Sequence, residues 1–343
     1  MVAILIGGTQ GLVALQEQPF GWEVWERTDE AWWGRRVYAL ANVASAGALL
    51  VGTDVGLLRS TDGGTTWTVV LEQMVRAIAA DPRDPARFFA GTQPAAVWRS
   101  DDGGLTWRGL AGPGTAEERA AWHLPGDTPI ETIPVARIAA FASDPRAPET
   151  VYAGVEIGGV WRSDDGGDSW RARVAGLPSL AIHALVPHPL EPETLFAATD
   201  TGVYRSVDGG ESWADRGFDT GAGYTRALLA LAPDGAEERP ILLAGPAEVD
   251  LWGWDEEPDG ARSGLFRSDD DGATWYHLGE RHGLPDSFDG LISALAVDSD
   301  DAHTLWLGTW DGRVYVSRDR GEGWTQVAED LGQVWCMLPL VER

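Results

Sequence analysis

The chain has 343 residues and a formal net charge of −27, with 53 acidic residues against 26 basic ones, and every base is an arginine. So acidic a surface repels nucleic acid and anionic membranes, and the lack of lysine excludes Schiff-base chemistry and a lysine-containing phosphate loop. The single cysteine, Cys336, excludes an intramolecular disulfide and is expected to be a structural thiol in a buried strand.

The first residues of the sequence already predict β-strands. Residues 4–8 and 11–13 are apolar runs separated by a short turn, and Trp22–Trp25 fits a further strand. Nothing before them resembles a secretory signal, and no apolar run approaches the roughly 20 residues of a membrane helix. We therefore expect a cytoplasmic protein.

From residue 36 onward, a unit of four short strands recurs, and each unit carries the phrase Ser-x-Asp-x-Gly-x-Thr/Ser-Trp. The phrase predicts a turn between the third and fourth strands, in which Asp accepts backbone hydrogen bonds and Gly supplies φ > 0. Its Trp is expected to pack against the neighbouring unit. The aspartates of the six copies are Asp62, Asp102, Asp165, Asp208, Asp270 and Asp319; only the last copy replaces the Thr, with Gly323.

Residues 334–338 resemble the first strand of a unit that does not continue, and joining them to the N-terminal strands makes a seventh unit. That closure would leave no open edge. We therefore predict an all-β fold, a seven-bladed β-propeller of four-stranded antiparallel blades forming one domain over 1–343, with six blades as the alternative count. One blade is closed by 1–27 with 333–341, and the others are expected at about 36–71, 74–111, 134–175, 180–217, 225–279 and 290–329.

The repeated phrase resembles the Asp-box, or bacterial neuraminidase (BNR) repeat. Propellers with this repeat include sialidases, xyloglucan-degrading enzymes, sortilin-type receptors and photosystem II assembly factors. The resemblance covers nearly the whole chain and implies the propeller fold, with the box as a structural turn away from the binding face. Sialidase activity is not supported, because the Arg-Ile-Pro segment usual in sialidases is absent and no third arginine of their carboxylate clamp can be matched.

The long segments between the copies are where function is expected, because long loops on a rigid scaffold often carry binding or catalytic residues. Aromatic rings beside carboxylates in these segments are typical of a sugar site. The alternative is that the tryptophans only pack the insertions against the blades. The candidates in the long segments are Trp32, Trp33, Trp122, His123, Trp252, Trp254 and Asp255, and the shorter loops add Glu156, Tyr224, Arg226, Trp310 and Asp311.

A second candidate set comes from aligning the innermost strands, which places their equivalent side chains toward the central channel. Arg76, Arg137 (with a one-residue slip) and His183 could bind a carboxylate or phosphate there. The same alignment brings Tyr38, Leu229, Ser293 and Trp335 to comparable positions. Water-bridged lining of the channel, with ion pairs to loop acids, is the alternative.

No complete catalytic set or metal-ligand pattern stands out, so we expect no metal and no cofactor. The sequence favours a scaffold that binds a ligand or a protein partner on the face with the long loops, as a monomer. The alternative is a glycoside hydrolase or lyase that uses loop carboxylates and tryptophan sugar platforms, which would need two carboxyls about 5–5.5 Å or about 6.5–9.5 Å apart. Whether the protein is an enzyme stays open.

Overall fold

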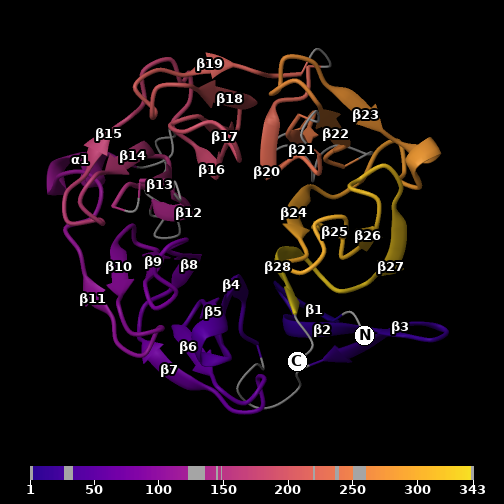
Figure 1. Ribbon diagram of the computed structural model, residues 1–343, viewed down its shortest axis with the longest axis horizontal. Coiled ribbons are helices and arrows are strands. Elements are labelled where there is room, and N and C mark those ends of the chain that lie inside the picture. Colours follow the sequence, from indigo (N-terminus) through magenta and orange to yellow (C-terminus); the bar gives the residue numbers. More distant parts are fainter. Residues whose placement is uncertain are drawn as a thin grey trace. The chain divides into compact units, whose positions relative to one another are not determined.

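The computed structural model describes residues 3–26, 34–122, 136–143, 146–147, 149–218, 221–235, 239–249 and 260–340. Within these ranges the strands form seven four-stranded antiparallel sheets, so the predicted all-β, seven-bladed propeller fold is confirmed (Figure 1). The chain divides into two compact units, residues 1–40, 200–203 and 216–343, and residues 41–199 and 204–215. None of the helices in the described ranges is long and apolar enough to cross a membrane.

The first unit contains three whole sheets. One orders its strands β28 (Val334–Leu340), β1 (Ala3–Gly8), β2 (Gly11–Gln18) and β3 (Gly21–Glu26). The other two follow chain order, as β20 (Tyr224–Leu231), β21 (Ile241–Ala247), β22 (Leu265–Ser268) and β23 (Tyr276–Leu278), and as β24 (Ile292–Val297), β25 (Leu305–Thr309), β26 (Val314–Ser317) and β27 (Thr325–Ala328).

The second unit holds two whole sheets and most of two more. The whole sheets are β8 (Val75–Ala80), β9 (Phe88–Thr92), β10 (Val97–Ser100) and β11 (Arg108–Gly109), and β12 (Arg137–Ser143), β13 (Val151–Glu156), β14 (Gly159–Ser163) and β15 (Arg171–Ala172). The others are β4 (Val37–Val43), β5 (Ala48–Thr53), β6 (Leu57–Ser60) and β7 (Thr68–Leu71), and β16 (Ile182–Pro187), β17 (Leu195–Thr199), β18 (Val203–Ser206) and β19 (Ala214–Asp215). The short helix α1 (Ala116–Ala121) follows β11.

Strands from the two ends of the chain share one sheet, as the sequence predicts. Strand β1 pairs on one edge with β2, where Ala3 faces Gln16, and on the other with β28, where Ala3 faces Leu340. Beyond the strands, the backbone N–H of Gln333 donates to the hydroxyl of Thr9 at 2.9 Å. The C-terminal strand therefore saturates the second edge of β1.

Each Asp-box is a turn held by its own Ser and Asp. In the first copy, the Ser60 hydroxyl donates to Asp62 Oδ1 and accepts from the N–H of Gly64, both at 2.8 Å. The same Asp62 oxygen accepts the backbone N–H of Thr66 at 2.8 Å, and Oδ2 accepts its hydroxyl at 2.7 Å. In the last copy, Gly323 keeps the backbone bond to Asp319 at 2.8 Å and lacks the hydroxyl bond.

The arginine that opens the box connects successive turns. Arg59 donates through Nε to the carbonyl of Gly103 at 3.0 Å, and Arg99 donates through Nη1 to that of Gly166 at 3.0 Å. The same contact recurs from Arg162 to Gly209 and from Arg267 to Arg320. In the last copy Val316 replaces the arginine. The repeat therefore encodes a bond between adjacent blades as well as a turn within one.

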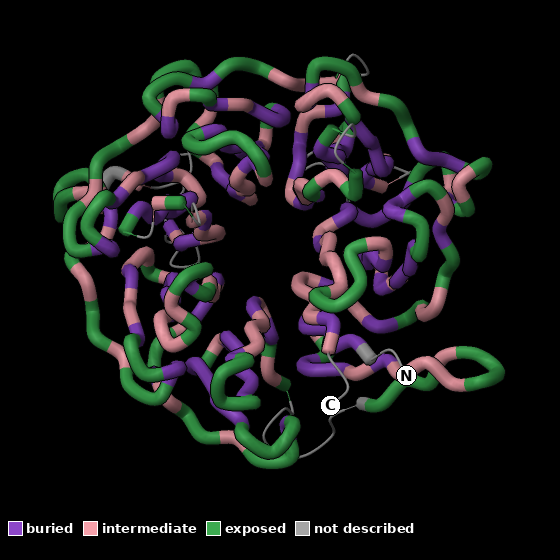
Figure 2. Tube along the Cα trace, in the orientation of Figure 1, coloured by how far each residue is buried: buried purple, intermediate pink, exposed green. Residues whose placement is uncertain are grey.

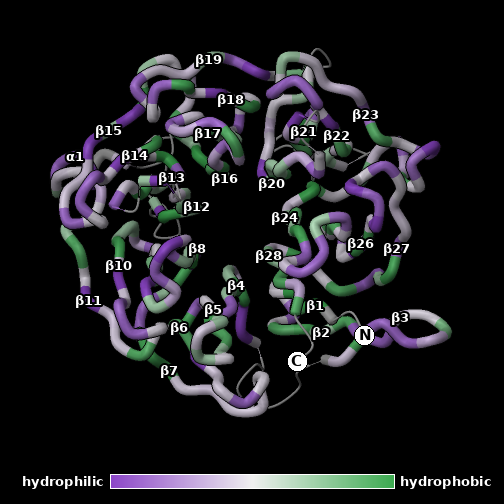
Figure 3. Tube along the Cα trace, in the orientation of Figure 1, coloured by the Kyte–Doolittle hydropathy of each residue, from purple (hydrophilic) through white to green (hydrophobic). Residues whose placement is uncertain are grey.

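The sheets pack through apolar side chains that alternate along the strands, and second strands are buried almost throughout (Figures 2 and 3). A glycine on the second strand faces an apolar residue on the first strand of the following sheet. A Cβ added at Gly245 would lie 2.6 Å from Cβ of Ile292, closer than real Cβ contacts allow. The same approach occurs at Gly7 with Val37, Gly52 with Val75, Gly91 with Ile138, Gly154 with Ile182 and Gly308 with Val334.

The box carboxylates predict an acid-sensitive fold. The hydrogen bonds from Ser169 and Ser163 lower the pKa of Asp165 from 3.8 to about 2. Because this folded-state pKa is depressed, the stability contributed by ionised Asp165 is complete above its ordinary pKa and is lost as pH falls through about 2. We expect Asp165→Asn to lower the melting temperature at neutral pH, and the gap from wild type to close toward pH 2. Exposed Glu72, changed to Gln, is the control, and a gap that stays constant with pH would contradict this role.

The close contact at Gly245 predicts a large cost for a single methyl group. Gly245→Ala should lower the free energy of unfolding in urea by about 1–3 kcal/mol, because the new Cβ overlaps Ile292. Ile292→Gly in the same background removes both side-chain atoms that the added Cβ would meet, Cβ at 2.6 Å and Cγ2 at 2.7 Å. The losses of the two substitutions should therefore be less than additive. Fully additive losses would show that the glycine is not required for this approach.

Candidate functional site

Aromatic, cationic and acidic side chains converge in the first unit, in what we call the Arg226–Trp310 cluster: Tyr224, Arg226, Trp310, Asp311 and Arg313. Tyr224 and Arg226 lie on β20, and the other three lie in or beside the turn between β25 and β26. The guanidinium of Arg226 lies 5.5 Å from the centre of the Trp310 ring and donates through Nη1 to the Tyr224 hydroxyl at 3.0 Å. The arginine is therefore held between two aromatic residues.

The turn that carries Trp310 is tied down on both sides. The backbone N–H of Trp310 donates to the carbonyl of Leu291 at 2.9 Å, and the ring packs against a small apolar group formed by Tyr224, Ala247, Ala261 and Leu291. The hydroxyl of Thr309 donates to Asp311. The indole is therefore positioned by its backbone and by packing, as a preformed recognition surface requires.

The carboxylates of the cluster are engaged with Arg313. Its Nε lies 3.1 Å from Asp311 Oδ2, and its Nη2 lies 3.7 Å from Asp289 Oδ2. Burial alone would lower the pKa of the Arg313 guanidinium, but the charge of Asp311, together with Tyr315 and the charge of Asp289, outweighs burial and raises that pKa. Arg313 and these two carboxylates therefore form fixed ion pairs, which can hold the shape of this part of the cluster and the positions of its charges.

Two other predicted site residues meet in the second unit. Arg137 on β12 and Glu156 on β13 face each other in the strand register and form an ion pair through Nη2 and Oε2. Both side chains are largely buried, with 15 and 18% of their surface exposed. Glu156 is thus occupied by an arginine of its own sheet.

Trp122 packs against the blade. It caps the C-terminus of α1, and its ring lies 5.8 Å from that of Trp161 at a tilt of 59°. A Cβ added at Gly114 would lie 2.9 Å from the Trp122 ring. This packing is what the alternative interpretation of the loop tryptophans describes. The candidates Trp32, Trp33, His123, Trp252, Trp254 and Asp255 lie outside the described residues.

A β-bulge occurs in the innermost strands β8, β12, β16, β20, β24 and β28, and its position corrects the alignment made from sequence. The register shifts between Val75 and Ala77 in β8, and between Ile182 and Ala184 in β16, so Arg76 and His183 are the bulged residues. Ser293 and Trp335 occupy the same position in β24 and β28.

In two strands the aligned residue is not the bulged one. The shift in β12 falls at Ala139, two residues beyond Arg137, and the shift in β20 falls at Arg226 and Ala227 instead of Leu229. Arg226 is therefore the strand equivalent of Arg76, and it is a strand residue instead of a loop residue. In β8 and in β20 an alanine directly follows the bulged arginine, and this pattern could have identified Arg226 from the sequence.

Cys336 lies on β28, and its sulfur approaches strands β1 and β4. Its Sγ is 4.0 Å from the carbonyl oxygen of Val37, and a Cβ added at Gly7 would lie 2.6 Å from it. Burial raises the pKa of the Cys336 thiol far above its ordinary value, which disfavours the nucleophilic thiolate.

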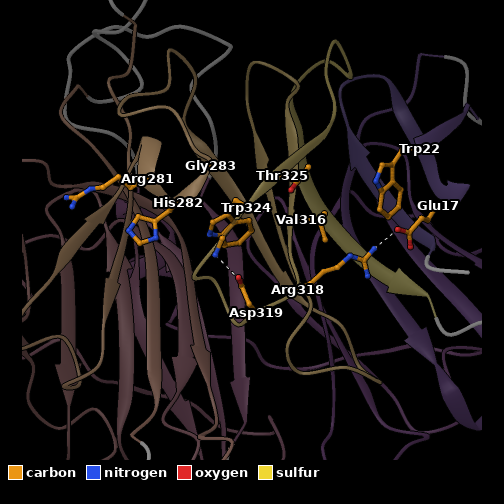
Figure 4. Close-up of a pocket in the computed structure, with 11 residues that line it drawn as sticks. Glu17, Trp22, Arg281, His282, Gly283, Val316, Arg318, Asp319, Trp324 and Thr325 are labelled. Atoms are coloured by element: carbon orange, nitrogen blue, oxygen red, sulfur yellow. Dashed lines mark hydrogen bonds and ion pairs between the residues drawn. The ribbon is translucent and has the colours of Figure 1, made fainter. Parts of the chain in front are cut away.

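A pocket of about 560 Å³ lies elsewhere in the first unit, between the β2–β3 hairpin and the last Asp-box (Figure 4). Trp22 and Glu17 of the hairpin form one wall, and Trp324 and His282 lie across it. Arg318 reaches over to Glu17, with Nη2 2.7 Å from Oε1. Asp319 and Gly323 of the last Asp-box line this pocket, whereas none of the ligand-binding candidates named from sequence is among its lining residues.

Comparison with known proteins supports the fold. No family model matches the chain. A xyloglucanase of Paenibacillus sp is 29% identical over 264 residues, which cover 67% of this chain and 24% of that protein. The structure of the GH74 xyloglucanase from Xanthomonas campestris aligns with a TM-score of 0.62 and 20% identity, over 86% of this chain and 45% of that chain. The structure of YCF48 bound to D1 peptide aligns with a TM-score of 0.55 and 17% identity, over 84 and 81% of the two chains.

The extent of these matches differs between the two groups. This chain spans only 17 to 24% of the length of the curated xyloglucanases that it matches, whereas its likeness to YCF48 covers most of both chains. The fold of this chain is therefore that of the BNR or Asp-box β-propellers, similar to GH74 xyloglucanases and to YCF48.

Proposed function

We propose that this protein is a binding scaffold that holds a segment of a protein partner at the Arg226–Trp310 cluster. The observation that carries the proposal is the arrangement of Arg226, a cation stacked on an indole and bonded to a tyrosine hydroxyl. Tyr, Trp and Arg are the residues that dominate binding energy at protein interfaces. The similarity to YCF48, whose structure contains a D1 peptide, supports a peptide partner.

The charge of the cluster indicates which part of a peptide it would hold. Arg226 presents a guanidinium, whose planar donors match a carboxylate in two parallel hydrogen bonds. Trp310 supplies an apolar face beside it. A segment with a carboxylate next to an apolar or aromatic side chain fits this pair, and a free C-terminus or an aspartate would supply the carboxylate.

A glycan is the second candidate, because the sequence is similar to a xyloglucanase over 264 residues. A tryptophan beside carboxylates could stack on a sugar ring. Of the carboxylates that the structure places near Trp310, Asp311 and Asp289 both interact with Arg313. That pairing supports recognition over acid–base catalysis, in which one carboxyl must release and regain a proton.

A peptide-binding assay tests the proposal. Peptides with an aromatic residue before a free C-terminus should bind, and their amidated counterparts should bind more weakly. Arg226→Ala should weaken binding by about 2 kcal/mol, or about thirtyfold in Kd, because a charged hydrogen bond is lost. Arg226→Lys should recover part of the affinity, since it keeps the charge without the planar donors. Arg171→Ala, which removes an exposed arginine from β15, is the matched control.

Xyloglucan oligosaccharides serve as the competing ligand in the same assay. We expect no release of new reducing ends and no competition with the peptide. Hydrolysis of the oligosaccharides would replace the peptide proposal with the glycan one. So would oligosaccharide binding that Trp310→Ala abolishes, if no peptide binds. Equal loss of peptide binding in Arg226→Ala and Arg171→Ala would show that the peptide responds only to overall charge.

A further inference from the structure

Strand β3 differs from the outer strands of the other six sheets. It has six residues, whereas β7, β11, β15, β19, β23 and β27 have two to four. It follows β2 through the two-residue turn Pro19–Phe20 in place of an Asp-box. Among the strands that the structure describes, β3 pairs with β2 alone, which leaves its other edge with backbone donors and acceptors in a row.

This hairpin also exposes large apolar side chains. Phe20 is fully exposed at the turn, and Trp25 and Val24 on β3 are 55 and 43% exposed. The hairpin extends away from the other sheets of the first unit (Figure 1). Apolar side chains clustered on an unpaired strand are an unusual surface for a protein of net charge −27, and such surfaces mark interaction sites.

One face of β3 anchors the hairpin to the neighbouring sheet. Trp22 and Val24 face the same side as Glu17 and Leu15, their partners across the hairpin. On that side, the ring of Trp22 packs edge-on against Trp306 at 5.3 Å. This packing anchors the hairpin on the neighbouring sheet, so that the free edge of β3 is held in a defined position.

We propose that β3 is a docking edge for an extended segment of a partner protein, which adds a strand to this sheet. Main-chain hydrogen bonds along the edge would supply affinity, and the exposed Trp25 and Val24 would contact alternate side chains of the segment. The pocket of about 560 Å³ lies on the Trp22 side of the hairpin, where side chains of the added strand would reach its rim (Figure 4).

The charge of the hairpin selects a basic segment. Glu23 is exposed on β3 itself. Glu17 on β2 already interacts with Arg318, so Glu23 is the carboxylate on β3 that a basic side chain of the segment would contact. A segment that alternates apolar residues with lysine or arginine would match both the pleat and the charge. This docking edge is separate from the Arg226–Trp310 cluster and does not rest on the function proposed there.

The test uses the full chain and a synthetic peptide that alternates valine and lysine, with blocked ends and a fluorescent label. We expect saturable binding by fluorescence polarisation. Glu23→Lys should weaken it by about tenfold, because an attractive charge becomes repulsive. Glu72→Lys is the matched control, since it makes the same charge change beside the outer strand β7. Trp25→Thr should also weaken binding while leaving the melting temperature unchanged.

Two further peptides separate strand addition from simple charge attraction. A valine–lysine peptide N-methylated at alternate residues on one edge should lose binding, and a valine–glutamate peptide should not bind. Binding of the N-methylated peptide as tightly as the parent, or an equal effect of Glu72→Lys, would overturn the proposal. A concentration-dependent dimer in light scattering that Trp25→Thr abolishes would also overturn it, by assigning the edge to a second copy of this chain.

Discussion

The absence of a side chain at one position of the second strand is the constraint on which the packing within each unit depends. At Gly91, for example, an added Cβ would lie 2.5 Å from Cβ and Cγ2 of Ile138. Because the β-branched residue occupies the space of the missing side chain, neighbouring sheets approach closely and still bury a full apolar layer. Strand β17 carries Ala198 in place of this glycine, so one blade tolerates a methyl group there.

Outside the apolar layer, polar side chains hold the turns together by hydrogen bonds and ion pairs. The box serine and aspartate satisfy the backbone of their own turn, and the box arginine reaches the carbonyl of the following turn. Other arginines join several acids at once; Arg87 lies within 3.4 Å of Asp81, Asp101 and Glu149. Much of the acidic composition is therefore employed in the scaffold, and a high content of carboxylates says little about catalysis.

The sequence predicted the fold because the repeat is written locally. Each box places Ser, Asp, Gly and Trp within nine residues, so its turn and the strands around it follow from spacing alone, and the count of seven follows from matching both ends of the chain. The bulges could not be read as directly. A bulge inserts one residue into one strand, so aligning strands by their apolar residues misplaced Leu229 and Arg137 relative to Arg226 and Ala139.

The candidate site was predictable only as a set of residue types. Trp310 and Arg226 were both singled out, but their contact joins residues that are far apart in sequence and depends on the register of two sheets. The box arginine recurs in five copies, and in four of them the structure gives it a partner on the next turn, which a pattern within one repeat does not reveal. The edge of β3 was missed because its exposure is a property of the assembled sheet.

The pairing of β1 with β28 has a consequence for the order of folding. Strand β1 is synthesised long before β28, and its second edge stays unpaired until residues 334–340 have left the ribosome. Contacts of such high sequence separation form slowly, because the entropic cost of closing a long loop comes before any hydrogen bond offsets it. During that interval the nascent protein carries an open apolar strand, and chaperone binding or premature pairing with another chain competes for it.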